Sequence, residues 1–357
     1  MPSGWGAVVP LNVGFALAGI VVVFGVRALI AVVTTRDYFG KHVRRVEALG
    51  FRERTVEVRD GVRLNIAEGP ANGIPLLLIP GQGSVWQEYA KAIPQLVDRF
   101  RVVAVDVHGH GRSSWDAADY TCVQIADDLA RLIDQVFGEP VAVAGHSSGG
   151  LIAARLAAAH PGEVRAVLLE DPPFFATEPD RVDRTFVGID VYAHVSSFLA
   201  QDAEDDWVCW YLRHSYWKRL LGPIWPALTR SVVRQRRADP GCLPVVRWVS
   251  VSINRIWESI SHPYDLRFTT AFIDNSWFVA LDQPQTLAAI ECPTVFVKAT
   301  TRYNRQGVLL AALSDDDLAR VESLLPDNRT VRVRSSHDVH FAKTGAYVQA
   351  LEQLVER

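Results

Sequence analysis

Short, mostly apolar runs constrain the fold of this chain more than any other feature. They cover residues 74–80, 101–106, 141–144 and 166–170, and two weaker runs follow at 294–299 and 330–333. Continuous apolar strands of this length are buried on both faces, as in a parallel sheet that is covered by helices. Helical patterns lie between or after the runs, at 86–96, 122–136, 151–159 and 342–355. The sequence therefore predicts an α/β fold.

Length and composition exclude several classes of protein. The chain has 357 residues, of which 49% are hydrophobic and 22% charged, so it is neither disordered nor fibrous. The net charge of −3 gives no global basic field, and we expect no nucleic-acid partner. The cysteines Cys122, Cys209, Cys242 and Cys292 lie far apart, which fits a reducing compartment better than a disulfide framework.

The N-terminus carries a membrane signal. Residues 7–26 contain no charged side chain, and twenty helical residues rise about 30 Å, the thickness of the hydrocarbon core. The alternative is a cleavable signal peptide, which requires positive charge before the apolar stretch. No Lys or Arg precedes residue 7. We therefore expect residues 1–35 to form a single-pass anchor helix.

The charges that flank this segment predict its orientation. Residues 36–54, interpreted as a basic linker, hold six cations against three anions. Since cytoplasmic flanks carry the excess of Lys and Arg, the N-terminus is expected outside and the remainder in the cytoplasm. A membrane lipid is thus an expected partner.

A sheet-based core that is interrupted by one long insertion is the expected organisation. Residues 55–67 alternate around Asp60-Gly61, which indicates a hairpin at the start of a first core segment, 55–171. The strand rhythm stops over 172–290 and resumes in a second core segment, 291–357. Seven of the ten tryptophans lie in the interrupted stretch, which predicts a helical cap above an apolar substrate cavity; ordinary core packing is the alternative.

The strongest chemical motif follows the run at 141–144. Gly145-His146-Ser147-Ser148-Gly149 is a G-x-S-x-G sequence between an expected strand and an expected helix. A serine on such a turn projects its hydroxyl at the carboxyl edge of the sheet, and the helix N-terminus supplies N–H groups for developing negative charge. Ser147 is therefore the candidate nucleophile.

With this motif in its context, the chain from about residue 56 onward resembles the α/β-hydrolase superfamily. Pro80-Gly81-Gln82-Gly83 matches the family's oxyanion loop, although Pro80 stands where His is usual. The resemblance implies an oxyanion hole made by the backbone N–H groups of Gln82 and Ser148. It also implies that His108 and His110 belong to a shaping turn; a metal pair is the alternative reading of these two histidines.

The same resemblance places the general base near the C-terminus. Ser336-His337-Asp338-Val339-His340 is similar to the family's loop with two histidines, of which the first is catalytic. His337 is thus the expected base, and His340 a packing or hydrogen-bonding neighbour. His146 is expected to be packed rather than catalytic.

The catalytic acid departs from the family pattern. The usual position, after the run at 294–299, holds Asn304 and no carboxylate. Some members take the acid from the end of the preceding core strand, where this chain has Glu170-Asp171-Pro172. We expect Asp171 to be the acid, with Glu170 second and Asn304 as a neutral orienter third; the alternative is that Asp171 only holds the cap hinge.

The resemblance implies a serine hydrolase without metal or other cofactor, and the apolar N-terminal run adds the expected membrane anchor. The tryptophan-rich cap and the anchor favour a small apolar ester, lipid-like or aromatic, as substrate. A carbon–carbon hydrolase or perhydrolase on the same residues is one alternative. A non-catalytic ligand-binding protein is the other. The sequence is silent on acyl-chain length and oligomeric state.

Overall fold

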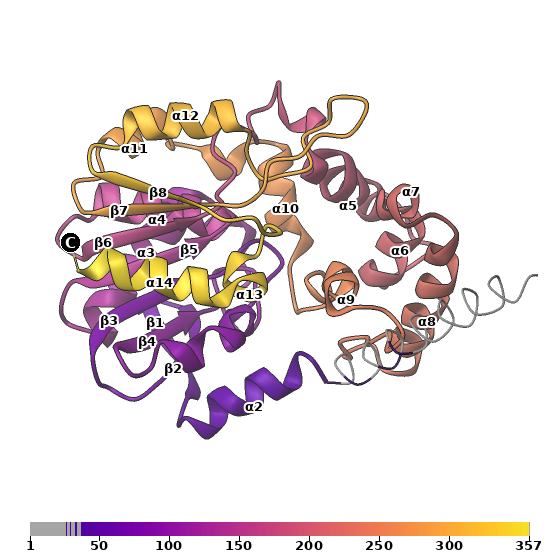
Figure 1. The fold of residues 1–357 in the computed structure, drawn as a ribbon, viewed down its shortest axis with the longest axis horizontal. Coiled ribbons are helices and arrows are strands. Elements are labelled where there is room, and N and C mark those ends of the chain that lie inside the picture. The colour runs from indigo at the N-terminus through magenta and orange to yellow at the C-terminus, as the bar shows by residue number, and fades with distance from the viewer. Residues whose placement is uncertain (1–25, 27–28, 30–32, 34–36, 357) are drawn as a thin grey trace, which may run out of the picture.

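An eight-stranded sheet forms the centre of the molecule (Figure 1). The structure is a computed structural model that describes residues 26, 29, 33 and 37–356. The sheet has the order β1-β2-β4-β3-β5-β6-β7-β8. Its strands are β1 (Arg52–Arg59), β2 (Val62–Glu68), β3 (Ile74–Ile79), β4 (Phe100–Val105), β5 (Val141–His146), β6 (Val164–Glu170), β7 (Thr294–Lys298) and β8 (Asn328–Arg332).

Strand directions follow the expectation from the sequence. Strands β1 and β2 form an antiparallel hairpin around Asp60-Gly61, and β2 also pairs antiparallel with β4. All pairs from β4 to β8 are parallel. The carboxyl ends of β3, β5, β6 and β7 therefore meet at one edge, which is where ligands bind in open parallel sheets.

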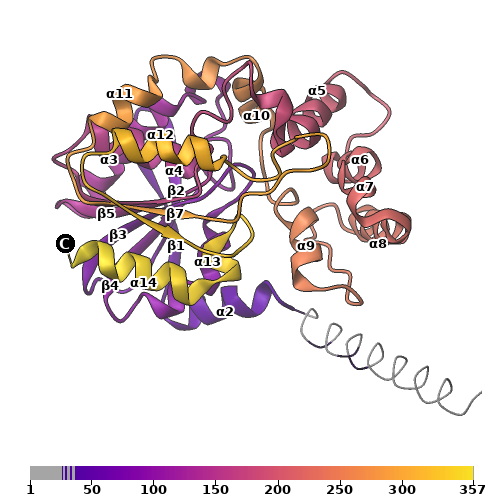
Figure 2. The same ribbon diagram turned by 45° about the horizontal axis from the view of Figure 1, so that its top comes forward.

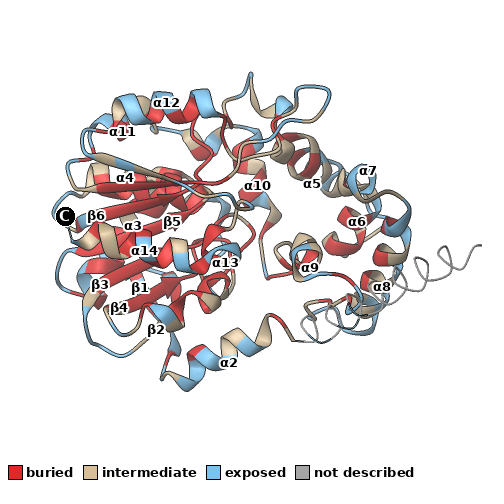
Figure 3. Ribbon diagram, in the orientation of Figure 1, coloured by how far each residue is buried: buried red, intermediate tan, exposed pale blue. Residues whose placement is uncertain are grey.

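Helices cover both faces of the sheet (Figure 2). One face packs against α3 (Cys122–Val136), α4 (Ser148–Ala159) and α12 (Asp315–Leu324). The other face packs against α14 (Thr344–Val355) and α2 (Gly40–Ala48). Figure 3 shows the strands between these layers as mostly buried. The short helix α13 (Val339–Ala342) precedes α14.

The helix predicted over 86–96 is instead two 3-10 turns, η1 (Trp86–Lys91) and η2 (Ile93–Gln95). Pro94 lies inside the predicted helix, and proline removes an N–H donor and clashes with the preceding turn of an α-helix. The turns still bury Trp86, Glu88 and Tyr89 against the sheet.

A helical cap is inserted between β6 and β7. Its helices are α5 (Ala193–Leu199), α6 (Trp207–His214), α7 (Trp217–Leu221), α8 (Trp225–Ala238), α9 (Val251–Glu258), α10 (Leu266–Ile273) and α11 (Gln283–Ala288). Short turns connect them: η4 (Val182–Arg184), the π-helical η5 (Gly188–Tyr192), η6 (Gly222–Ile224) and η7 (Ser276–Phe278).

The cap tryptophans do not all serve one purpose. Trp225 and Trp257 are buried in a hydrophobic cluster of the cap itself, together with Leu212 and Leu228. Trp277 is buried in the core cluster instead, as are Phe268 and Phe272 of α10. These rings therefore fill cores, which is the packing alternative, and α10 and α11 attach the end of the cap to the sheet.

The segment predicted to be a basic linker, 36–54, contains helix α2 and the first residues of β1. Val46 of α2 is fully buried against the core, so this segment is attached to the fold. The predicted anchor, residues 1–35, lies outside the described residues except for Val26, Leu29 and Val33. Among the residues that the structure describes, no helix has the length and apolarity needed to cross a membrane.

Candidate active site

Ser147 lies at a sharp turn between β5 and α4. Its backbone has φ 54° and ψ −122°, a conformation that residues with a Cβ rarely adopt. Two glycines permit this turn. A Cβ on Gly145 would lie 2.1 Å from the Gly149 carbonyl oxygen, and one on Gly149 would lie 2.4 Å from the carbonyl oxygens of Ile79 and Pro80. The motif therefore requires glycine at both positions because backbone approaches backbone.

Among the described residues, the backbone N–H groups of Ser148 and Gln82 are unpaired and lie beside Ser147, the first in the chain and the second in space. Ser148 is the first residue of α4, whose initial N–H groups have no partner within the helix. In the described part of the chain neither the backbone N–H of Ser148 nor that of Gln82 has a hydrogen-bond partner. Gly81 brings the Gln82 loop close, since a Cβ on Gly81 would lie 3.1 Å from the Ser147 Cβ. The two donors of the predicted oxyanion hole are thus free to bind an anion.

Contacts on both sides hold the Gln82 loop. The Gln82 side chain donates hydrogen bonds to Tyr264 Oη, at 2.9 Å, and to Thr269 Oγ1, at 2.7 Å, so it joins the loop to the cap. Gly83 N–H donates to His110 Nε2 at 2.9 Å. Burial lowers the pKa of His110 to about 4, so the ring is neutral near pH 7 and this nitrogen accepts.

The histidines at 108 and 110 have separate partners. His110 Nδ1 lies 2.8 Å from the His108 carbonyl oxygen, and His108 Nε2 lies 3.0 Å from Asp128 Oδ2. Each therefore supports the turn after β4, as the resemblance implies.

His337 and Asp171 come together from distant parts of the chain. His337 Nδ1 lies 2.8 Å from Asp171 Oδ2, across 166 positions of sequence. Asp171 is buried and has φ 45°, so the residue after β6 is also held in a left-handed conformation. Its other oxygen accepts from Ala299 N–H at 3.1 Å. The imidazole and the carboxylate are thereby fixed relative to each other.

Electrostatics favour an ionised Asp171 beside this ring. Burial opposes the charged carboxylate, but the hydrogen bond and charge of His337, and then the charge of Lys298, outweigh it and lower the pKa of Asp171. Burial likewise opposes the imidazolium, yet the bond to Asp171 raises the pKa of His337. When the ring is neutral, Asp171 accepts from Nδ1–H, and the lone pair of His337 is then on Nε2.

Lys298 also belongs to the site, although it was not among the residues predicted from the sequence. This side chain is 1% exposed, and its Nζ lies 3.5 Å from Asp171 Oδ1 and 2.7 Å from the Ala299 carbonyl oxygen. A lysine in an otherwise apolar strand was the available signal, because lysine is almost never fully buried unless it is paired.

The other two candidate acids have different partners. Glu170 binds His340: the carboxylate oxygens both lie 3.0 Å from His340 Nδ1, and Oε1 also accepts the His340 N–H at 2.8 Å. Asn304 Nδ2 donates to Tyr216 Oη at 2.9 Å, so Asn304 joins its loop to the cap. Of the three residues considered, Asp171 is the one bonded to His337.

Ser147 and His337 lie on the same edge of the sheet. The ring of His146, next to Ser147, is 4.5 Å from the His337 ring between centroids. Within the described residues the hydrogen bond of the His337 ring goes to Asp171, and none joins it to Ser147. Hydrogen bonds of this kind often shorten only when substrate is bound.

Comparison with known proteins agrees with this geometry. A family model described as alpha/beta hydrolase fold matches residues 74–187, which include the Gln82 loop, the Ser147 turn and Asp171. This protein has the α/β-hydrolase fold. The solved structure of E-2-(acetamidomethylene)succinate hydrolase aligns over 86% of this chain and all of that one, with a TM-score of 0.59 and 19% identity. A membrane phospholipase A, titled a bacterial virulence factor, aligns over 96% of this chain and 98% of its own, with a TM-score of 0.61 and 21% identity.

Sequence relatives cover less of the chain. Lipase LipV of Mycobacterium tuberculosis is 39% identical over 104 residues, which are 29% of this chain and 38% of that protein. The alignments to the first curated relatives span about a third of those proteins' lengths. None of these alignments spans a whole relative.

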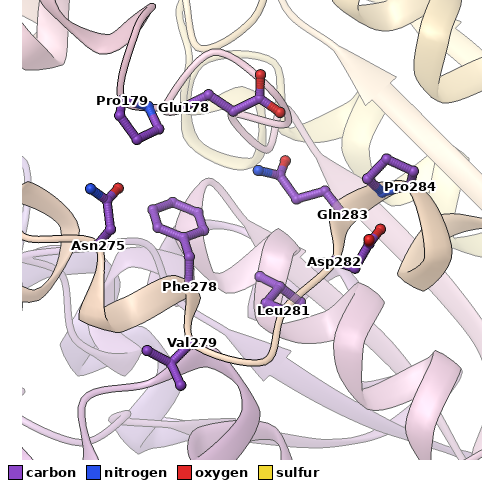
Figure 4. Close-up of a pocket in the computed structure, with 9 residues that line it drawn as sticks. All are labelled: Glu178, Pro179, Asn275, Phe278, Val279, Leu281, Asp282, Gln283 and Pro284. Atoms are coloured by element: carbon purple, nitrogen blue, oxygen red, sulfur yellow. The ribbon is translucent and has the colours of Figure 1, made fainter.

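Two surface hollows of this α/β-hydrolase fold lie away from the Ser147 turn. One is lined by residues of the cap ends, among them Glu178, Phe278 and Gln283 (Figure 4). The other is lined by Tyr192 and Phe272, among others. Neither includes Ser147 or His337.

Backbone strain at Ser147 is directly measurable. We expect Ser147→Gly to be about 1 kcal/mol more stable to unfolding than Ser147→Ala, because only glycine adopts φ 54° without Cβ strain. Both variants lack the hydroxyl, so urea unfolding of the pair isolates the Cβ contribution. Equal unfolding midpoints and slopes would show that the turn is unstrained.

Proposed function

We propose that this protein is a serine hydrolase that cleaves a carboxylic ester through an acyl-enzyme. The observation that carries the proposal is the 2.8 Å hydrogen bond between His337 and Asp171 at the edge of the sheet where Ser147 turns. A buried carboxylate that fixes a partly exposed imidazole beside a serine turn is the arrangement of a catalytic triad. The match to the α/β-hydrolase fold supports it.

The proposed reaction starts from an ionised Asp171 and a neutral His337 ring whose proton is on Nδ1. His337 Nε2 takes the Ser147 hydroxyl proton as Oγ attacks the ester carbonyl carbon. The tetrahedral oxyanion is stabilised by the N–H groups of Gln82 and Ser148. His337 then gives the proton to the leaving alcohol as the carbon–oxygen bond breaks. A water molecule, which gives a proton to His337, then attacks the acyl carbon of the acyl-enzyme. The bond to Ser147 Oγ breaks, His337 returns the proton to Oγ, and the carboxylic acid is released.

An apolar substrate, lipid-like or aromatic, is the class that we propose. Relatives in sequence and structure carry the names lipase and phospholipase A. The cap, which joins the Gln82 loop through Tyr264 and Thr269, supplies aromatic side chains near this edge. The non-catalytic alternative rested on the missing acid after β7, and the bond between Asp171 and His337 removes that reason.

Covalent labelling tests the nucleophile. We expect a fluorophosphonate probe to label membranes that contain the wild-type chain, and labelling to be lost in Ser147→Ala and strongly reduced in His337→Ala, because attack requires both groups. Labelling is read by in-gel fluorescence. If the wild type is labelled no better than Ser147→Ala, the protein is not a serine hydrolase.

Substitution of the candidate acids tests the third residue. We expect Asp171→Asn to lower kcat on a short p-nitrophenyl ester by about 10²–10⁴-fold, because the ring loses its charged partner and correct tautomer. Asn304→Ala removes a contact to the cap at the family's usual acid position and should change kcat less than tenfold, and Glu170→Gln should lose much less than Asp171→Asn. An Asp171→Asn enzyme with wild-type kcat would contradict the assignment.

We further propose that residues 7–26, of which the structure describes Val26 alone, anchor the protein in a membrane with the hydrolase domain on the cytoplasmic side. Leu220 and Ile224, which follow Lys218 and Arg219 in the chain, are exposed, as is Trp248 of the cap, and such side chains are suited to contact lipid. Protein–lipid contact would bring an apolar substrate to the cap.

Membrane extraction tests the anchor. We expect the full chain to stay in carbonate-washed membranes and the double variant Val22→Lys, Phe24→Lys to be released, because each mid-helix lysine costs about 3 kcal/mol. Val22→Leu, Phe24→Leu is the matched control. Release of the wild type would exclude an integral anchor, and digestion of a C-terminal tag by protease added to intact cells would reverse the orientation.

A further inference from the structure

Three buried side chains beneath the candidate active site form a cluster with the composition of a metal site. Glu88 comes from η1, His146 from the end of β5 and His340 from α13. One ligand atom from each lies within 4.8 Å of the others. The residues are 2%, 6% and 0% exposed, so water does not solvate these polar groups.

The polar atoms of the cluster lack hydrogen-bond partners. Within the described part of the chain, Glu88 Oε2, both ring nitrogens of His146 and His340 Nε2 are buried and make no hydrogen bond. Buried polar groups without partners are rare in proteins, and they call for a bound water or ion. Because one imidazole directs only one of its two nitrogens at an ion, the three residues offer three ligand atoms to one common partner.

Glu170 gives His340 the orientation of a metal ligand. Both Glu170 oxygens lie 3.0 Å from His340 Nδ1, so this nitrogen donates its proton and Nε2 presents a lone pair. Histidines that bind metal almost always donate their second ring N–H to a carboxylate or carbonyl group in this way. Glu170 is itself fully buried, and the His340 N–H holds one of its oxygens.

The spacing suits a small tetrahedral cation. Two ligands on one Zn²⁺ lie about 3.4 Å apart, and His146 Nδ1 lies 3.3 Å from Glu88 Oε1. Gly81 orients the carboxylate, since its N–H donates to Glu88 Oε1 at 3.2 Å. The third ligand has to move inward by about 1 Å to complete the set.

We propose that Glu88, His146 and His340 bind one Zn²⁺ ion, with Glu170 as the carboxylate that orients His340. Two imidazoles and a carboxylate are ligands that zinc prefers, and a water molecule would complete the four-coordinate site. The ion would join three elements. The Gln82 loop precedes the first, η1; the Ser147 turn follows the second, β5; and the His337 loop precedes the third, α13. The ring of His146 separates it from His337, at 4.5 Å between centroids.

Zinc retention tests the site independently of activity. The purified full chain is stripped with a chelator, incubated with one equivalent of ZnCl₂, desalted and analysed by mass spectrometry for metal. We expect about one zinc per chain in the wild type and at least about tenfold less in Glu88→Gln and His340→Gln. His262→Gln is the matched control, because His262 is also buried and bonded to a buried glutamate, Glu258, at 2.8 Å.

Two further measurements keep the test decisive if a variant fails to fold. Zinc should raise the melting temperature of the wild type and of His262→Gln, and Co²⁺ in the stripped wild type should give the intense visible absorption of a four-coordinate site. A wild type that retains no zinc and shows no such spectrum overturns the proposal. So does equal retention by the wild type and folded His340→Gln, which would mean surface binding only.

Discussion

Close contact between backbones at the carboxyl edge of the sheet is the constraint on which the rest of this structure depends. The turn that holds Ser147 touches the end of β3 and its own following helix so closely that a single Cβ on Gly145 or Gly149 would overlap a carbonyl oxygen. Because the strands are parallel, β6 and β7 end at the same edge. Side chains that are separated by more than a hundred positions therefore meet within hydrogen-bonding distance.

The two carboxylates at the end of β6 show how this edge distributes its groups. Glu170 is the last residue of β6 and Asp171 is the first residue after it, and the two bind different histidines. Asp171 also has a positive φ, so its backbone no longer follows the extended conformation of β6. Two histidines three positions apart, His337 and His340, thus receive one buried carboxylate each, and their surroundings differ: His337 is partly exposed and His340 is fully buried.

Much of the fold and part of the site could be predicted from the sequence. Apolar runs located the parallel strands, and the glycines around Ser147 located the turn, because both depend on local sterics and burial. The helix over 86–96 was wrong, since the apolar pattern outweighed Pro94 in that prediction. A lysine in an apolar strand is a local signal for Lys298, but its contact with Asp171 and the cluster around Glu88 join distant segments, which no local pattern contains. Trp225, Trp257 and Trp277 of the cap pack in hydrophobic cores while Trp248 is exposed, and residue type alone does not determine which of these roles a tryptophan takes.

The side chain of Gln82 has a consequence for how the site opens. Its side-chain amide donates to Tyr264 and Thr269 of the cap, while the neighbouring Gly81 lies against the Ser147 turn. Entry of a bulky molecule that lifts this part of the cap would pull the same residue away from the serine. Admission and turnover would then alternate: the pathway is open only while anion stabilisation is dismantled, and closure over the reactant restores it.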